Sequence, residues 1–128
     1  MVIVLCSLDI EKYSCVSGDI VTDEVIITEE RLSHVKDKHP EIAEVCKDYL
    51  ALAIEDPDYI IQSNKPHSAL ILKEILFDKI RLKIIMRLVT STDSSEWKNS
   101  VITFHKTSEK EWRRLIKNKK VLYSKKNG

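Results

Sequence analysis

The second half of the chain alternates between apolar and polar positions with a period of two residues, which is typical of β-strands. The alternation predicts four strands, which cover residues 58–62, 68–77, 80–89 and 99–106. Asp78 and Lys79 leave room only for a tight turn, so the second and third strands are predicted to pair as a hairpin. Residues 90–98 are polar and are predicted to form a loop before the last strand.

The first half of the chain shows helical periodicity. Residues 25–28 predict a short strand that ends at Thr28, a residue suited to cap a helix over about 29–38. Pro40 ends this helix, because proline disfavours helical geometry at the residue before it, and it suits the start of a second helix. Asp56-Pro57 is predicted to stop the second helix. Its apolar stripe consists of Ile42, Val45, Cys46, Tyr49, Leu50, Ala53 and Ile54.

Further elements are expected near both ends of the chain. Residues 1–8 are predicted to form a strand, and residues 9–23 an irregular lead-in. Ser108 and Glu111 have the spacing of a capping box and predict a short C-terminal helix, which an edge strand at 121–123 would follow. We therefore expect an α+β fold with two N-terminal helices packed on an antiparallel sheet of about four strands, and a short C-terminal helix.

Length and composition narrow the class of protein. A chain of 128 residues, 43% of them hydrophobic and 32% charged, predicts one globular domain over 1–128 with a core at about 22–123. No apolar run approaches the roughly 20 residues of a membrane span, and the opening residues lack the basic flank of a signal peptide. Three cysteines without C-x-x-C spacing argue against a disulfide framework or a zinc site, so a cytoplasmic protein is expected.

The charges are unevenly distributed along the chain. Residues 1–64 hold 5 Lys and Arg against 14 Asp and Glu, whereas residues 65–128 hold 16 against 6. Such a division predicts a basic face for an anionic partner, and nucleic acid is the first candidate. The alternative is that the two halves neutralise each other in the folded protein.

The third predicted strand separates apolar from basic side chains. One face would carry Ile80, Leu82, Ile84, Met86 and Leu88, and the opposite face would carry Arg81, Lys83 and Arg87. In the fourth strand, alternation places Val101, Thr103 and His105 on one face, and Ile102 and Phe104 on the other. The three cations suit contact with phosphates. The alternative is an ordinary solvated sheet face.

Two histidines in the segment HVKDKHPE (34–41) are predicted to point to different sides of the first helix. Leu32, Val35 and His39 share the inward stripe, so His39 is expected to fix the corner between the two helices. Arg31, His34 and Lys38 form a separate outward stripe. His34 is thus presented among cations, where an anionic ligand is favoured.

This set of residues suits one kind of chemistry better than others. The chain has two glycines and therefore lacks the glycine-rich turns of a serine hydrolase or a phosphate loop, and its H-x4-H spacing is a weak zinc signal. Metal-free RNA cleavage needs only a base, an acid and cations, since the 2′-hydroxyl is the nucleophile. His34, His105, Thr103 and the basic strand face could supply these groups without a metal or other cofactor.

The order of these features resembles the phage-associated branch of the BECR nuclease superfamily, which is named for barnase, EndoU, colicin nucleases and RelE. In that branch a strand leads into a helix with H-x4-H-P-E, a second helix ends at a P-D-x-I-like start of the sheet, and a late strand carries V-I-T. The matching segments here are His34–Glu41, Pro57–Ile60 and Val101–Thr103. The resemblance spans residues 22–107.

The resemblance implies a BECR-like nuclease domain and roles for three residues. His34 would be the catalytic candidate on the helix, His39 a second candidate or a support, and Thr103 the polar residue of the late strand. His105 lies beyond the signature, so its candidacy rests on strand alternation alone.

Three functions are compatible with the sequence. The leading hypothesis is a metal-independent ribonuclease that cleaves RNA through 2′-hydroxyl attack with histidine acid–base catalysis. In this hypothesis the domain is a toxin module with a cognate inhibitor or antitoxin. One alternative is a non-catalytic domain on the same scaffold that binds RNA or a protein. The other is a toxin-neutralising partner whose acidic half mimics nucleic acid.

Overall fold

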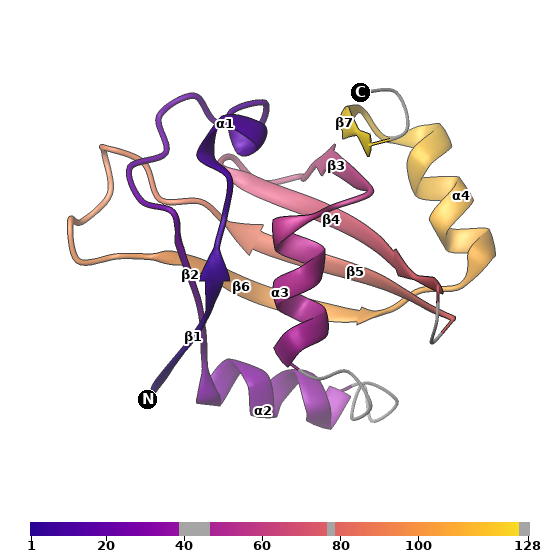
Figure 1. The fold of residues 1–128 in the computed structure, drawn as a ribbon, viewed down its shortest axis with the longest axis horizontal. Coiled ribbons are helices and arrows are strands. Elements are labelled where there is room, and N and C mark those ends of the chain that lie inside the picture. Colours follow the sequence, from indigo (N-terminus) through magenta and orange to yellow (C-terminus); the bar gives the residue numbers. More distant parts are fainter. Residues whose placement is uncertain (39–46, 77–78, 126–128) are drawn as a thin grey trace.

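The structure is a computed structural model that describes residues 1–38, 47–76 and 79–125. Seven strands in this part of the chain form one sheet in the order β1-β2-β6-β5-β4-β3-β7 (Figure 1). The strands are β1 (Val2–Ser7), β2 (Glu24–Thr28), β3 (Tyr59–Gln62), β4 (Ser68–Ile75), β5 (Ile80–Arg87), β6 (Asn99–Lys106) and β7 (Val121–Ser124). Neighbouring strands are antiparallel except β2 and β6, which are parallel.

The predicted α+β class is confirmed, but the sheet has more strands than the four predicted. The additional members are β1, β2 and β7, which the sequence predicted as separate short strands. Strand periodicity shows that a segment is extended, but it does not show which strand it pairs with. The β2–β6 pairing joins residues more than seventy positions apart, beginning with Val25 opposite Asn99.

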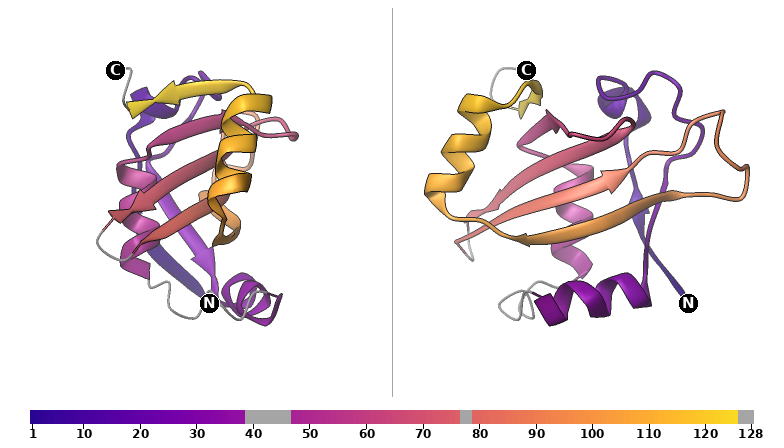
Figure 2. Two further views of the ribbon diagram at one scale, coloured as in Figure 1. Left: turned by 90° about the vertical axis from the view of Figure 1, so that its right-hand side faces the viewer. Right: turned by 180° about the vertical axis from the view of Figure 1, so that it is seen from behind.

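Four helices occur in the described residues, and their arrangement differs from the prediction. They are α1 (Ile10–Tyr13), α2 (Glu29–Lys38), α3 (Lys47–Glu55) and α4 (Glu109–Asn118). Figure 2 shows α3 and α4 on opposite faces of the sheet, with α2 at one end of the molecule beside β6. The prediction that both N-terminal helices pack on the sheet is therefore wrong for α2, which follows β2 directly and contacts the sheet margin.

The predicted boundaries of α2 are confirmed. The Thr28 hydroxyl accepts a hydrogen bond from the Arg31 amide at 3.1 Å, as expected of a capping residue. Of the predicted second helix, Leu50, Ala53 and Ile54 are buried in α3. The stripe residues Ile42, Val45 and Cys46 lie outside the described residues, as does the predicted corner at His39 and Pro40.

The larger core lies between the sheet and α3. It includes Val35 of α2 and a side chain from the segment predicted to be irregular, Tyr13 of α1. Tyr13 is fully buried, and its hydroxyl donates to the Ile54 carbonyl oxygen at 2.7 Å, which ties α1 to the end of α3. A four-residue helix gives too short a pattern for helical periodicity to reveal it.

A smaller core lies on the opposite face beneath α4. Ile61, Leu70 and Leu72 pack there against Leu115, and Trp112 meets Tyr59 edge-on with ring centroids 6.0 Å apart. The predicted cap of this helix is confirmed, since the Ser108 hydroxyl accepts from the Glu111 amide at 3.1 Å. Among the described residues, no helix is long and apolar enough to cross a membrane.

The predicted faces are confirmed for β5 but not for β6. Residues 80–87 alternate strictly between buried and half-buried. In β6 the register shifts opposite Ile85 and Met86, where Thr103 pairs with Ile85 and Val101 pairs with Met86. Ile102 is the extra residue of this β-bulge. The predicted grouping of Val101 with Thr103 and His105 is therefore wrong, because the bulge turns Val101 and Phe104 to the core.

The buried side chain of Asn99 joins three segments of the chain. Its amide nitrogen donates to the carbonyl oxygens of Thr22 and Glu24 at 2.7 and 3.1 Å, and its amide oxygen accepts from the Val89 amide at 2.8 Å. These bonds fix the start of β6 against the entry to β2 and the end of β5.

We predict that Asn99→Ala lowers the free energy of unfolding by about 2 kcal/mol or more, because buried polar groups lose their partners. Urea denaturation measures this change. The control is Ser100→Ala at the neighbouring half-buried position, where the change should stay within about 0.5 kcal/mol. An Asn99→Ala protein as stable as the wild type would contradict the assigned role.

Candidate functional site

A groove of about 540 Å³ lies between α2 and the β3–β4 connection. Its lining includes Ile85, which also packs against the smaller core, so the groove is on the face of the sheet that carries α4. Helix α2 supplies Arg31, and the sheet supplies side chains from β5 and β6. Among the described residues, the lining consists of Arg31, Ser63, Asn64, Lys65, Ser68, Ile85, Arg87, Ile102 and Thr103. We refer to this set as the groove.

His34 lies in a neighbouring cavity of about 360 Å³, which Thr28, Glu30 and Arg31 also line. Arg31 belongs to both linings and so connects His34 with the groove. Residues three apart on a helix are neighbours on its surface, which places His34 one turn from Arg31. His34 is exposed, as the helical pattern predicted, whereas Val35 next to it is buried.

The bulge in β6 shapes the floor of the groove. Without it, Ile102 and Thr103 would point to opposite faces of the sheet. With it, both side chains line the groove beside Ile85. The Thr103 hydroxyl thus lies on the same face as Arg87, two positions farther along β5 from Ile85.

Arg87 is held in place by the loop that follows β5. Its guanidinium contacts Asp93 at 3.0 Å and donates to the Leu88 carbonyl oxygen. Asp93 also accepts from the Thr90 amide at 2.8 Å. The Thr90 amide, with the charge of Arg87, holds the pKa of Asp93 below its usual range. The cation at this end of the groove is therefore fixed before any ligand binds.

A second group of predicted residues lies nearer to α4. His105 is opposite Lys83, and Lys83 contacts Glu111 of α4 at 3.8 Å. Burial opposes ionisation of Glu111, but the Thr107 hydroxyl and the charges of Lys83 and His105 still lower its pKa. Arg81 pairs with Glu74 at 3.2 Å.

Comparison with known proteins identifies the family. The model of the family described as phage-Barnase-EndoU-ColicinE5/D-RelE like nuclease2 matches residues 8–124. The chain belongs to this nuclease family. The resemblance to phage-associated BECR nucleases is therefore confirmed across most of the chain. No curated protein and no solved structure shows a significant match to it.

In this member of the family, the predicted site residues fall into separate groups. The groove and the adjoining cavity bring together Arg31, His34, Arg87 and Thr103. His105 shares the face of Thr103 but does not line the groove, and Arg81 and Lys83 lie toward α4 with carboxylate partners. Lys38 is exposed at the end of α2 and lines neither cavity, and His39 lies outside the described residues.

Sequence reasoning missed the contribution of the β3–β4 connection. Ser63, Asn64, Lys65 and Ser68 line the groove. A polar segment with a proline, SNKPHS, lies between two apolar runs and is a clear loop signal. Nothing in that signal shows that the loop faces α2 across the sheet.

The ion pair of Asp93 generates a pH prediction. Because the folded-state pKa of Asp93 is lowered, its stabilising effect is present above the unfolded pKa of about 4 and is lost as pH falls through the folded pKa. Asp93→Asn should therefore melt at a lower temperature than the wild type at pH 7. The difference between the two proteins should shrink as pH falls from about 5 to 2.

Melting curves over this pH range provide the measurement. Asp23→Asn is the matched control, because Asp23 is an exposed aspartate directly before β2. Its melting temperature should follow the wild-type dependence on pH. A constant difference in melting temperature between Asp93→Asn and wild type at every pH would contradict the prediction.

Proposed function

We propose that this protein is a metal-independent endoribonuclease and that the groove beside α2 is its active site. One observation carries the proposal: α2, β5 and β6 bring Arg31, Arg87 and Thr103 to one cavity beside His34. Membership of a nuclease family supports a nucleic acid as the substrate.

The reaction uses the 2′-hydroxyl of the RNA as the nucleophile. A base on the protein removes the hydroxyl proton while the 2′-oxygen bonds to the adjacent phosphorus. The bond from phosphorus to the 5′-oxygen of the next nucleotide breaks, and an acid on the protein protonates that oxygen. The products are a 2′,3′-cyclic phosphate and a free 5′-hydroxyl, so DNA, which lacks the nucleophile, is not cleaved.

The groove supplies charge stabilisation for this reaction. The pentacoordinate phosphorus carries additional negative charge, which Arg31 and Arg87 would stabilise. The Thr103 hydroxyl would donate to a phosphate oxygen. Arg87 is fixed by hydrogen bonds to Asp93 and to the Leu88 carbonyl oxygen, and its remaining N–H donors can bond to a phosphate.

His34 and His105 are the proposed proton carriers. His34 lies one turn from Arg31, whose charge would draw the phosphate toward it. The Nδ1 atom of His105 lies 3.0 Å from the Lys106 carbonyl oxygen, which can only accept a hydrogen bond. A neutral ring that donates from Nδ1 carries its proton on that atom. His39 is retained as a candidate from the family pattern.

The biological part of the proposal is a cytoplasmic toxin that a cognate inhibitor protein neutralises. The toxin role is supported by the phage-associated nuclease family. The cytoplasmic location follows from the proposed RNA substrate, which is met in the cytoplasm. Induced expression of the wild type should then stop bacterial growth, and expression of a folded His34→Ala variant should not.

We predict that His34→Ala lowers the rate of RNA cleavage by about 10²-fold or more, the usual contribution of a general acid or base. The measurement is a cleavage time course on single-stranded RNA in excess chelator. The melting temperature should be unchanged, since the side chain is exposed. Lys36→Ala, another exposed position on α2, is the control and should cleave at nearly the wild-type rate.

The same assay separates the competing functions. Full activity of a folded His34→Ala protein would remove His34 from the mechanism and leave His105 as the better candidate. Salt-sensitive binding of RNA without cleavage by the wild type would favour the non-catalytic binding domain. Loss of cleavage in chelator, restored by a divalent metal, would contradict metal independence.

A further inference from the structure

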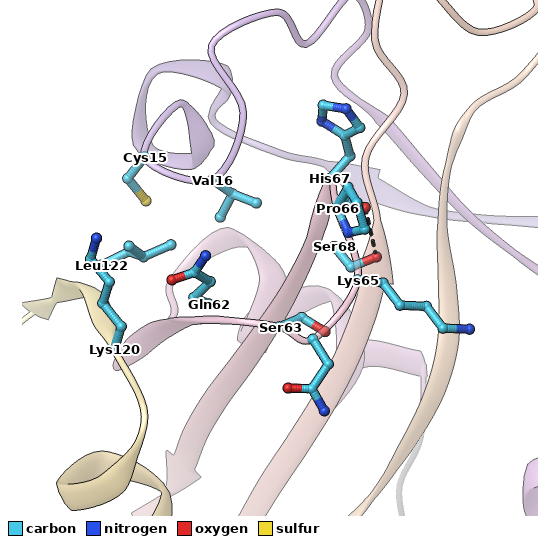
Figure 3. Close-up of a pocket in the computed structure, with 11 residues that line it drawn as sticks. Cys15, Val16, Gln62, Ser63, Lys65, Pro66, His67, Ser68, Lys120 and Leu122 are labelled. Atoms are coloured by element: carbon cyan, nitrogen blue, oxygen red, sulfur yellow. Dashed lines mark hydrogen bonds between the residues drawn. The ribbon is translucent and has the colours of Figure 1, made fainter.

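The β3–β4 connection, residues 63–67, is a wall between the groove and a second cavity. The second cavity has a volume of about 440 Å³, and it is lined by Cys15, Val16, Gln62, Ser63, Asn64, Lys65, Pro66, His67, Ser68, Lys120 and Leu122 (Figure 3). Four residues line both spaces: Ser63, Asn64, Lys65 and Ser68. A ligand that leaves the groove over this wall therefore enters the second cavity.

The two spaces share an electrostatic character. Among the described residues, no carboxylate lines either of them, although the chain contains 20 Asp and Glu. Arg31 and Arg87 lie in the groove, Lys65 belongs to both linings, and Lys120 lies in the second cavity. In the groove, Arg87 pairs with Asp93, which lies outside both linings. The cavity beside α4 differs because carboxylates belong to its lining, where Glu74 pairs with Arg81 and Glu109 with Arg113. The groove and the second cavity thus form one track suited to a polyanion.

The wall between them is anchored at three points. The Ser17 hydroxyl lies 2.9 Å from Nδ1 of His67, and the Leu88 amide donates to the His67 carbonyl oxygen at 2.7 Å. The Lys119 ammonium donates to the Asn64 side chain at 3.0 Å. These contacts come from three separate parts of the chain, so the wall is preorganised and both spaces exist before a ligand binds.

The second cavity has the groups that a nucleotide needs. Val16 and Leu122 offer apolar contact to the flat face of a base. The Gln62 amide can both donate to and accept from a base edge. Figure 3 shows Gln62, Leu122 and Lys120 gathered on one side of the connection, whereas Lys65 extends away from them. Lys65 is therefore positioned to contact an RNA phosphate between the two spaces. Lys120 is positioned to contact a phosphate farther along the RNA.

We infer that single-stranded RNA crosses the β3–β4 connection and that the second cavity binds a nucleotide flanking the one cleaved in the groove. This inference rests on the proposed function, because it assigns a further subsite to the same RNA strand. It also implies that longer RNAs bind more tightly than the groove alone allows, through Lys120 and the cavity walls.

Alkylation of Cys15 tests occupancy of the second cavity without relying on activity. Cys15 is an exposed residue of its lining, although burial raises the pKa of the thiol, which donates to the Lys12 carbonyl oxygen at 3.3 Å. Cys6 is half-buried, and burial raises its pKa to about 12. Iodoacetamide labelling is followed by peptide-level mass spectrometry, which counts each cysteine separately. A 2′-O-methyl RNA octamer, which cannot be cleaved, should slow Cys15 labelling by about tenfold or more, because a strand stacked in the cavity covers the thiol. An unchanged labelling rate with bound octamer would overturn the inference.

Substitution of Lys120 tests the contact itself. Lys120→Ala should weaken octamer binding by about threefold to tenfold at 50 mM salt. The slope of the logarithm of the binding constant against the logarithm of the salt concentration should fall in magnitude by about one, as expected for one lost phosphate contact. Lys117→Ala removes the same charge from α4 and lines neither space, so it should leave Cys15 protection unchanged. Equal effects of the two substitutions on octamer binding would overturn the assignment of Lys120.

The outcomes separate this inference from the proposed function. If the wild type cleaves RNA and binds the octamer, but Cys15 is alkylated as fast as without RNA, only the second subsite is wrong. If the wild type neither cleaves nor binds RNA, the proposed function is wrong and the inference is overturned with it.

Discussion

The side-chain amide of Asn99 makes the hydrogen bonds on which the geometry of the groove depends. It bonds to the backbone at Thr22 and Glu24, before and within β2, and at Val89, just beyond β5. Strand β2 leads directly into α2, which carries Arg31 and His34, and β6 begins at Asn99 itself. One buried residue therefore joins the start of β6 to the end of β5 and to the strand that leads into α2, and these elements supply Thr103, Arg87 and Arg31 to the groove. A parallel strand pair needs such a fixed point, because no hairpin sets its register.

The charge asymmetry of the sequence is resolved in two ways in the folded protein. Some cations of the second half pair with carboxylates of the first half, as Lys73 does with Asp56 at 3.1 Å and Lys98 with Glu24 at 3.4 Å. Lys73 is nearly buried, so this pairing offsets a desolvation cost that an isolated ammonium would carry. The groove and the second cavity have cations but no carboxylate among their described lining residues, and of these cations Arg87 pairs with Asp93 of the following loop. Neutralisation and a basic face, posed as alternatives by the sequence, thus coexist in different regions.

The two faces of the sheet differ in what they contribute to the protein. One face is covered by α1 and α3 and forms the larger core, which holds the strands together. The other is covered by α4 over β3 and β4, and the remaining area over β5 and β6 carries the groove. A polar site on a rigid strand surface keeps its side chains in position more accurately than one built from loops alone. The β-bulge at Ile102 brings Thr103 to this face, whereas Val101 and Phe104 stay in the core.

The sequence by itself determined the features that depend on local physical preferences. The strict alternation of β5, the capping of α2 by Thr28 and of α4 by Ser108, and the exposure of His34 beside buried Val35 follow from residues a few positions apart. The family pattern is likewise readable from short segments, and the family match confirms it over residues 8–124. These features need no knowledge of which elements are neighbours.

Only the tertiary structure decided how distant segments meet. The seven-strand order, the parallel β2–β6 pair and the contribution of the β3–β4 connection to the groove depend on long-range pairing that no local pattern encodes. The bulge in β6 had no sequence signal either, because an extra residue in one strand is defined by the partner strand opposite it. The sequence therefore named Arg31, His34, Arg87 and Thr103 as separate candidates, and the packing of α2 against β6 is the reason that they surround adjoining cavities.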